Sequence, residues 1–463
     1  MGFHSVFFLF LFLPIYLIIS LLPGKKVRGA IMLVLSLIYV FLLDREAFPL
    51  FIGMLVFTYL MALGLSSSIV KEQKYKRWLW LGVGINVAIL AGLKFLVARG
   101  EFSVMPAGYS FFSFTAIAYL LDIYKRQTLA EKNVFLFANF LLFFPKMMAG
   151  PITRWKGFAQ DAQKERVTIN EKTAGLRRFI LGLAKKVLIA NQLGTILDGG
   201  IFLQQVPLVT TATAWMMLLF YGIQLYYDFA GYTDMAIGLA KMVGIDLPEN
   251  FDLPYISSSI TEFWRRWHIT LSSWFRDYVF MPLEWKRRKW KWLKQTMNTL
   301  LVFLLTGLWH GFSLNFVIWG MLHGIFAALE NSKSLGGKIK QLPKWLQHLY
   351  TMLVVFIAWV FFRSPTTAYA LGWLRALVGF GTHVNLVGYS VLPHVGSTTW
   401  LAFIIGVVLA TPLIKGLRNE LVSNQRYTFG TQLAQNCAYL ILLVGSIVVA
   451  ATSSYLPTIY GNF

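Results

Sequence analysis

Charged residues are scarce in this chain: they make up 13% of its 463 positions, whereas hydrophobic residues make up 57% and aromatic residues 16%. A soluble domain has about twice that share of charged residues. The scarcity excludes an ordinary soluble fold and indicates a protein that crosses a membrane several times. The net charge of +22 comes from short clusters of Lys and Arg between apolar runs. Such clusters are typical of cytoplasmic loops and of contact with anionic lipid head groups, and we expect no nucleic-acid binding.

Cysteine and the common catalytic motifs are also nearly absent. Cys437 is the single cysteine, so one chain can form neither an internal disulfide nor a cysteine metal site. The sequence has no GxxxxGK[ST] phosphate loop, no HExxH zinc helix and no GxSxG serine elbow. Hydrolysis by zinc or by an internal serine triad therefore has no support, and we expect no metal site.

Two histidines stand out because they lie inside an apolar run at 299–330. This run is too long for one upright membrane helix of about 20 residues and too short for two. Gly311, Ser313 and Asn315 are the residues at which we expect the helix to break. In one continuous helix His310 and His323 would point about 140° apart and lie about 20 Å apart along the axis. They can share one site only if the helix breaks.

From the pattern alone, two interpretations of these histidines stay open. Each could be a hydrogen-bonded core residue, which is the commoner case, or a catalytic group. Both are followed by Gly, which lets a ligand or another backbone approach closely. A buried imidazole tends to stay neutral because burial disfavours its cation, and the neutral form is the one that a general base needs.

Apolar runs predict the remaining helices at about 5–23, 29–43, 47–65, 78–98, 109–121, 134–150, 179–197, 212–229, 349–363, 367–380, 399–415 and 433–452. The loops at 24–28 and 71–77 are basic, so the positive-inside rule places them in the cytoplasm and the N-terminus outside. Between two further basic loops, the segment at 143–151 contains Pro145 and Pro151. We interpret it as a re-entrant or interfacial segment.

Two acidic residues and one aromatic helix add to the candidates. Asp228 and Asp234 fall in or near the bilayer, where a charge is costly; they either serve function, or cap helices or pair with basic residues. The segment 260–280 has apolar residues at helical spacing, rich in Trp, with Arg on the other side. This pattern predicts one helix lying in the membrane plane, either a plain anchor or a cytoplasmic lip that binds an anionic donor.

Six segments of the chain are distinctive as motifs: GYSFFSFTAIAYLLDIYKR (108–126), FFPKMMAGPITRW (143–155), YYDFAGYTDMAIG (226–238), LPENFDLPYISSSITEFWRRWHITLSSWFRDYVFMPL (247–283), GLWHG (307–311) and WGMLHG (319–324). Together they resemble the membrane-bound O-acyltransferases, most of all the membrane subunits of alginate and peptidoglycan O-acetylation. The resemblance implies one all-α membrane domain of roughly eleven transmembrane helices with re-entrant segments around a central funnel. We divide it into N-terminal helices at 1–107, a motif-bearing core at 108–330 and C-terminal helices at 331–463.

The resemblance also implies a chemistry. The invariant histidine of the family falls on His323, the expected general base, and His310 would orient the donor or polarise its carbonyl. The implied donor is acetyl-CoA, used as a substrate with no bound cofactor. An extracytoplasmic SGNH-fold partner and a polysaccharide acceptor would receive the acetyl group, and the chain would lie in the cytoplasmic (inner) membrane of a bacterium. Other residues that we predict to line the substrate path or channel are Tyr226, Asp228, Asp234, Asn250, Trp264, Arg265, Arg266, Trp267, His268 and Arg276.

Two alternatives remain at this stage. The D-alanyl transferases of teichoic acid modification share FW-x-RWH-like and WFRD-like motifs, so D-alanyl transfer from a carrier protein is the nearest rival. A non-enzymatic polysaccharide transporter or export subunit would also use broken helices and buried carboxylates. An acyltransferase requires His323, whereas an export subunit would tolerate its loss.

Overall fold

The structure is a computed structural model that describes residues 2–22, 24–71, 75–102, 104–198, 210–332, 334–380, 395–413 and 429–453. Within these ranges the chain is helical and contains no strand. Six of the helices described there are long and apolar enough to cross a membrane: Lys25–Leu43, Phe48–Val70, Lys76–Ala98, Ile169–Ile196, Lys344–Arg363 and Gly430–Thr452. The protein is therefore an all-α, polytopic membrane protein, as the composition predicted. The predicted total of roughly eleven transmembrane helices stays a prediction.

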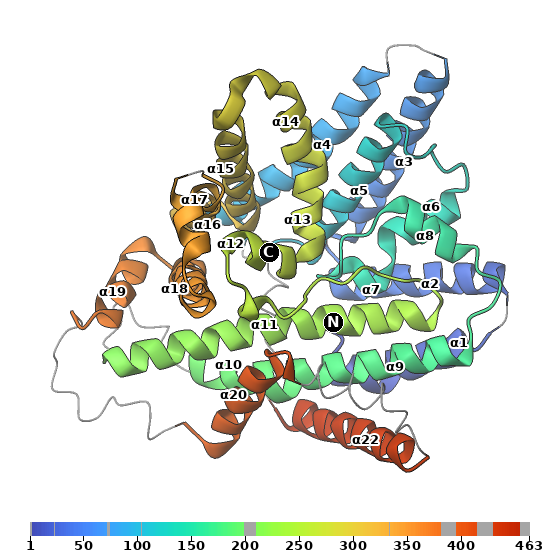
Figure 1. Cartoon of the computed structure of the whole chain (residues 1–463). Coiled ribbons are helices and arrows are strands. Elements are labelled where there is room, and N and C mark those ends of the chain that lie inside the picture. Colours follow the sequence, from blue (N-terminus) through green and yellow to red (C-terminus); the bar gives the residue numbers. More distant parts are fainter. Residues whose placement is uncertain are drawn as a thin grey trace.

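The N-terminal part consists of apolar helices close to the predicted bounds. They are η1 (Phe8–Phe12), α1 (Leu13–Ser20), α2 (Lys25–Leu43), α3 (Phe48–Val70), α4 (Lys76–Ala98) and α5 (Tyr109–Tyr124). Almost every residue of α5 is buried, and α5 packs against α3 and α4. In Figure 1 these three helices form one end of the molecule.

The predicted interruption near Pro145 is present. The chain forms α6 (Val134–Leu142), the single turn α7 (Phe144–Met147) and then α8 (Trp155–Ala162), with non-helical residues between α7 and α8. This non-helical backbone is buried, which is the condition under which irregular backbone is tolerated at membrane depth.

Two long helices, α9 and α11, run side by side through the centre of the molecule (Figure 1). They belong to a series with bounds α9 (Ile169–Ala184), η2 (Lys185–Ala190), α10 (Asn191–Ile196) and α11 (Thr211–Met242). The sequence predicted that the helix now labelled α11 ends near 229. This prediction was wrong, because α11 continues for another 13 residues to Met242. The predicted start at 179 was also late, since α9 begins at Ile169.

Glycines allow α9 and α11 to pack in backbone contact. A Cβ atom at Gly182 would lie 2.6 Å from the carbonyl oxygen of Gly231, and one at Gly238 would lie 2.6 Å from that of Gly175. Close approach through small residues is a common way for helices to associate in membranes, where the hydrophobic effect between helices is weak. These contacts hold α9 and α11 together at the centre of the molecule.

The segment 260–280 is not the single membrane-plane helix that its pattern predicted. It is divided into α12 (Ile260–Arg266), α13 (Ile269–Phe275) and η5 (Arg276–Phe280). His268, between α12 and α13, has left-handed backbone angles (φ 45°), and the aromatic side chains Phe263, Trp264 and Trp274 are buried in the protein rather than laid on lipid. An apolar stripe at helical spacing is expected whether the helix faces lipid or the protein core. The sequence alone therefore could not distinguish these two arrangements.

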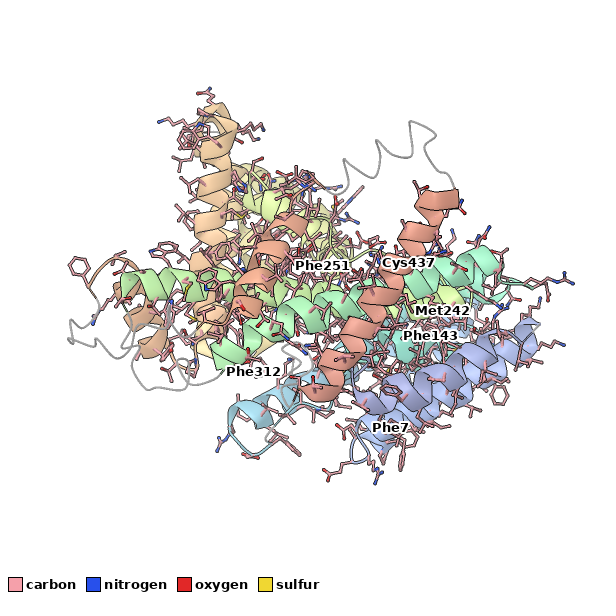
Figure 2. The ribbon with its side chains drawn as sticks, turned by 90° about the horizontal axis from the view of Figure 1, so that it is seen from below. Phe7, Phe143, Met242, Phe251, Phe312 and Cys437 are labelled. Atoms are coloured by element: carbon pink, nitrogen blue, oxygen red, sulfur yellow. The ribbon has the colours of Figure 1, made fainter. Side chains whose placement is uncertain are left out.

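The remaining helices complete the described part of the fold. Their bounds are η4 (Pro254–Ile256), α14 (Met281–Lys286), η6 (Arg288–Trp290), α15 (Lys291–His310), α16 (Leu314–Glu330), α17 (Leu335–Gln341), α18 (Lys344–Arg363), α19 (Thr367–Leu377), α20 (Ser397–Leu409) and α22 (Phe429–Thr452). Figure 2 shows α22, which carries the exposed Cys437, lying across the molecule near α9.

Candidate active site

The two central histidines lie on a helical hairpin, α15 and α16, whose break is at the predicted position. α15 ends at His310 and α16 begins at Leu314. Ser313 caps α16 by accepting a hydrogen bond from the backbone N–H of Phe316. Because the chain turns here, the thirteen-residue separation of His310 and His323 no longer holds them on opposite faces of one helix.

Two glycines bring α15 and α16 close together. A Cβ atom at Gly320 would lie 2.4 Å from the carbonyl oxygen of Phe303, and one at Gly307 would lie 2.4 Å from that of Phe316. No side chain fits at either position without moving the helices apart. This close packing holds both histidines near Trp319.

His323 is completely buried in a cage of aromatic side chains. Its ring centroid lies 5.2 Å from that of Trp264 and 5.4 Å from that of Trp319, both edge-on, and 6.1 Å from that of Phe263, which is parallel to it. Neither ring nitrogen has a hydrogen-bond partner among the described residues, and the same is true of the indole N–H groups of Trp264 and Trp319.

Such a cluster of unpartnered polar atoms is unusual. Most buried polar groups in proteins are hydrogen-bonded, because an unmade hydrogen bond costs about 1–3 kcal/mol. The neutral ring of His323 can accept one hydrogen bond and donate another, and each of the two indole N–H groups can donate one hydrogen bond. The cage therefore offers one base and several donors to a polar group that enters it.

Three buried histidines are connected through two tryptophans. The ring centroid of Trp319 lies 4.8 Å from that of His310 on one side and 5.4 Å from that of His323 on the other. Trp309 lies 4.6 Å from His310 and 6.1 Å from His268, also between ring centroids. We call these five residues the histidine–tryptophan array. The structure thus brings His268 together with His310 and His323, whereas the sequence linked only His310 and His323, through the expected helix break.

Asn250 orients the imidazole ring of His268. Both residues are among the candidates predicted from the sequence. Nδ1 of His268 lies 3.1 Å from Oδ1 of Asn250, which also accepts hydrogen bonds from the backbone N–H and the hydroxyl of Thr270 at 3.1 and 2.9 Å. Since Oδ1 is an acceptor, Nδ1 of His268 carries the hydrogen in this network. The other ring nitrogen, Nε2, is then an acceptor, and it has no hydrogen-bond partner in the described part of the chain.

Helix α12 supplies Phe263 and Trp264 to the cage, and a carboxylate from α16 holds it in place. Glu330 accepts hydrogen bonds from the backbone N–H groups of Ile260 and Thr261 at 2.6 and 3.0 Å, and from the Thr261 hydroxyl at 3.0 Å. A negative charge at a helix N-terminus is favourable because it satisfies the free N–H groups and the helix dipole. The helix that bears His323 therefore also fixes the helix that covers it.

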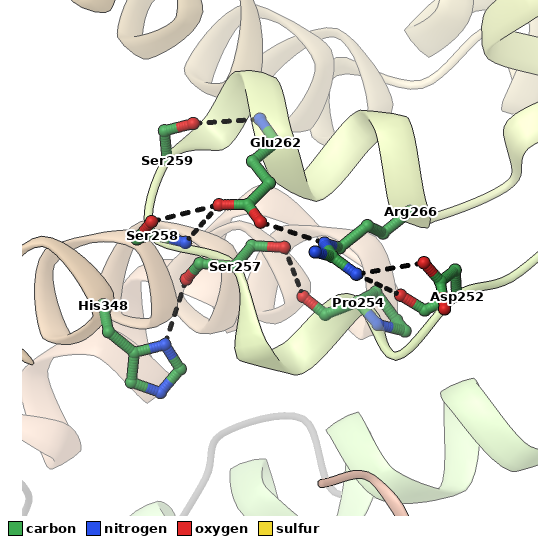
Figure 3. Close-up of polar contacts among 8 residues, drawn as sticks. All are labelled: Asp252, Pro254, Ser257, Ser258, Ser259, Glu262, Arg266 and His348. Atoms are coloured by element: carbon green, nitrogen blue, oxygen red, sulfur yellow. Dashed lines mark hydrogen bonds and ion pairs between the residues drawn. The ribbon is translucent and has the colours of Figure 1, made fainter. Parts of the chain in front are cut away.

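A second polar network supports α12 from its outer side (Figure 3). Glu262 accepts hydrogen bonds from the backbone N–H and hydroxyl of Ser258 and from Arg266, and Arg266 also forms an ion pair with Asp252. Burial opposes ionisation of Glu262, but these hydrogen bonds outweigh it and lower the pKa of its carboxyl group. His348, on α18, lies with Nδ1 3.0 Å from the carbonyl oxygen of Ser257.

The two acidic candidates on α11 form ion pairs with the neighbouring α9–η2 segment. Asp228 pairs with Lys186, and both side chains are buried. Asp234 lies 2.6 Å from both Arg178 and Lys185. Of the two interpretations left open, pairing with basic residues is the one that the structure exhibits. Tyr226, on the same helix, is buried between Phe251, Tyr255 and Trp267.

The arginine candidates do not form one cluster. Arg266 is used in the network of Figure 3. Arg265 is exposed, and Arg276 is exposed on η5, where its side chain pairs with Asp277 at 2.8 Å. Trp267 is buried against Phe263, with their rings stacked. Of these three arginine candidates, Arg265 and Arg276 are thus the two with exposed side chains.

Sequence reasoning did not name Trp309, Trp319 or Glu330 as site residues, and it also missed a lysine. Lys94 is buried on α4, and its ammonium lies 5.8 Å from the ring centroid of Trp309 in the histidine–tryptophan array. The signal was a single lysine within the last turns of an otherwise apolar helix. A buried cation beside an aromatic ring gains a cation–π interaction, and it would also favour an anion close to the array. In the ranges that the structure describes, no group of His, Cys, Asp and Glu side chains has the arrangement of a metal site.

Comparison with known proteins identifies the kind of enzyme to which this geometry belongs. Residues 110–370 match the model of the membrane-bound O-acyltransferase family. The chain belongs to this family. It is 35% identical, over the full length of both chains, to the probable alginate O-acetylase AlgI of Pseudomonas putida. It is also 31% identical to the peptidoglycan O-acetyltransferase of Helicobacter pylori, across 100% of this chain and 97% of the relative.

A D-alanyl relative matches over a smaller part. The teichoic acid D-alanyltransferase of Bacillus subtilis is 33% identical across 55% of this chain and 66% of its own. The matches confirm the family predicted from the sequence motifs, and they make this O-acyltransferase a membrane O-acetyltransferase, with the D-alanyl enzymes as more distant relatives.

Proposed function

We propose that this O-acyltransferase takes an acetyl group from acetyl-CoA at the cytoplasmic face and passes it through the membrane for O-acetylation of a cell-envelope or exported polysaccharide. Two of its relatives are named for the O-acetylation of alginate and of peptidoglycan, which supports a polysaccharide acceptor. The single observation that carries the proposal is the cage around His323: a fully buried imidazole whose ring nitrogens and neighbouring indole N–H groups have no hydrogen-bond partners among the described residues.

The proposed reaction uses His323 as a general base. A ring nitrogen takes the proton from an attacking hydroxyl, whose oxygen forms a bond to the thioester carbonyl carbon. The carbon–sulfur bond then breaks, and the proton passes to the departing thiolate. The rings of Trp264 and Trp319 lie edge-on to that of His323, and their indole N–H groups would donate to the carbonyl oxygen as it gains negative charge. The neutral imidazole that this role requires is favoured by burial.

His310 would orient the acyl group on the other side of Trp319, and His268 would form the far end of the array. We assign Tyr226, Asn250 and Trp267 to the walls around these rings. Asp228 and Asp234, through their ion pairs with α9 and η2, would hold α11 in position under the array. One continuous hydrophobic core extends from the N-terminal helices to α22, which supports a single membrane-embedded domain over 1–463.

The donor would bind at the exposed arginines outside the cage. The phosphates of CoA suit Arg265 and Arg276 because guanidinium groups bind phosphate oxygens with paired hydrogen bonds. CoA cannot cross a bilayer, so only the acetyl group would move through the protein. We infer that the acceptor is an extracytoplasmic SGNH-fold partner that passes the acetyl group to the polymer, and that the chain lies in the bacterial inner membrane with its N-terminus outside.

Label transfer in membrane vesicles tests this function. With radiolabelled acetyl-CoA supplied on the cytoplasmic side, label should appear in the polysaccharide fraction, and it should be absent in vesicles without the protein. D-alanyl transfer, the alternative that the Bacillus subtilis relative supports, predicts label only from a D-alanylated carrier protein. Label from neither donor would instead favour an export role and remove the acyl-transfer proposal.

A further inference from the structure

A cavity that is separate from the histidine–tryptophan array lies between α2, α6, α8 and the turn after α11. Its volume is about 650 Å³, which is within the range of about 300–1,000 Å³ that is usual for ligand sites. Figure 2 labels two residues near it: Phe143, which lines the cavity, and Met242, which directly precedes the lining residue Val243. None of the residues in the proposed acyl-transfer reaction lines this cavity.

The lining is divided into a basic end and an apolar end. Lys25, Lys26 and Arg28 line it from the first turn of α2. The next turns of the same helix contribute Met32 and Leu33. Since each residue of a helix advances about 1.5 Å, the charged and apolar parts are separated by roughly 5–10 Å along α2. This is the polarity of a phospholipid, whose phosphate lies directly above its acyl chains.

The charge at the basic end of the cavity stays positive when its ion pairs are taken into account. Lys25 forms an ion pair with Glu165 at 2.7 Å, and the guanidinium of Arg28 donates to the carbonyl oxygen of Lys164. Lys26 is exposed. Lys25, Lys26 and Arg28 all act on Glu165, and Glu171 acts on Arg28 as well. Three cations against two carboxylates leave a surplus positive charge that an anionic phosphodiester would neutralise.

A buried amide provides an independent sign of a ligand. Asn139 lines the cavity and is more than nine-tenths buried. Its Nδ2 donates to the carbonyl oxygen of Gly29 at 2.6 Å, which fixes the orientation of the amide. Oδ1 has no hydrogen-bond partner among the described residues, so it could accept from a hydroxyl group of a ligand.

The apolar end is bordered by exposed apolar side chains. Its rim includes Val34, which is 54% exposed on the membrane-spanning helix α2, and Phe135, which is 70% exposed on α6. Its floor includes Phe143 and Phe158, which are buried. Exposed apolar side chains beside a buried apolar floor suit acyl chains that enter from the side.

We propose that this cavity binds one anionic glycerophospholipid with a hydroxyl-bearing head group, its phosphodiester between Lys25, Lys26 and Arg28 and its acyl chains on the apolar floor. A lysine beside an anionic lipid strengthens binding about fivefold. The preference for phosphatidylglycerol over phosphatidylcholine should therefore fall at least about tenfold when two lysines are removed. This site is separate from the proposed acetyl transfer and does not depend on it.

The test is native mass spectrometry of the purified full chain, titrated with phosphatidylglycerol and with phosphatidylcholine of the same acyl chains. Wild type should retain one phosphatidylglycerol selectively. The double variant Lys25→Ala with Lys26→Ala should lose this selectivity, whereas Lys338→Ala with Lys340→Ala, an equal loss of charge on exposed side chains of α17, should keep it.

A second pair of variants tests the apolar end without changing charge. Ala30→Trp, in the lining, should block retention of either lipid, and Val27→Trp, an exposed position on the same helix outside the lining, should not. Equal retention of both lipids in every variant would overturn the proposal, because it would mean general lipid contact. Displacement of the lipid by glycerol 3-phosphate or by acetyl-CoA would also overturn it, since the cavity would then bind a soluble phosphate.

Discussion

The link between Glu330 and the N-terminus of α12 should control both stability and activity. Glu330→Gln keeps the shape of the side chain but replaces one of its two accepting oxygens with an NH2 group. In the wild type one oxygen accepts from Ile260 and the other from the backbone and hydroxyl of Thr261. The single carbonyl oxygen of the glutamine can accept hydrogen bonds from only one of these two residues. Its NH2 group then faces the backbone N–H donor of the other residue.

The expected loss follows from these contacts. Hydrogen bonds to charged groups contribute about 1.5–3 kcal/mol each, and a buried donor left without a partner costs about 1–3 kcal/mol. We therefore expect Glu330→Gln to lower stability by about 2–3 kcal/mol. Because α12 places Trp264 against His323, displacement of α12 should also slow turnover, and a shift of about 1 Å near the chemistry can cost about a hundredfold.

Glu262→Gln is the matched control. Its carboxylate also accepts three hydrogen bonds, from Ser258 and Arg266, but the side chain is 32% exposed, so water can replace what is lost. Thermal unfolding in detergent and acetyl-transfer rate should both fall more for Glu330→Gln than for Glu262→Gln. Equal behaviour of the two variants would refute the argument that Glu330 positions the cage.

Three further predictions concern packing, charge and the donor. Gly320→Val should abolish activity, because its Cβ would lie 2.4 Å from a carbonyl oxygen of α15, while Gly337→Val, which meets nothing within 4 Å, should be active. Lys186→Met should destabilise the fold by about 3–5 kcal/mol and adding Asp228→Leu should recover most of it; unchanged unfolding of the single variant would contradict this. Arg265→Ala should raise the KM for acetyl-CoA, and a change in protein abundance with an unchanged KM would contradict a role of Arg265 in donor binding.

The sequence predicted the features that depend on neighbouring residues. The break between α15 and α16 was predicted from the length of the apolar run at 299–330 and from Gly311 and Ser313 within it. The family was identified from the resemblance of the sequence motifs. Both signals are local, because a helix break depends on residues within a turn or two.

Features that depend on distant partners were not predicted. The Trp-rich stripe at 260–280 fits lipid and protein equally well. Its α12 part packs on α16 and α18, and Trp274 stacks on Phe114 of α5. The neutralisation of Asp228 and Asp234 comes from Lys186, Arg178 and Lys185, about 40–60 residues earlier in the chain. One usable signal was overlooked: glycines spaced by seven, Gly175 with Gly182 and Gly231 with Gly238, mark the contact between α9 and α11.

The most direct test of the account is acetyl transfer by His323→Ala at a membrane level equal to that of wild type. The matched control is His348→Ala, which removes a histidine outside the cage whose contact is the carbonyl oxygen of Ser257. Loss of a general base typically costs about 10²–10⁴-fold in rate, so His323→Ala should transfer little or no label while His348→Ala transfers nearly as much as wild type. Normal transfer by His323→Ala would show that the caged imidazole is a core residue and not the base.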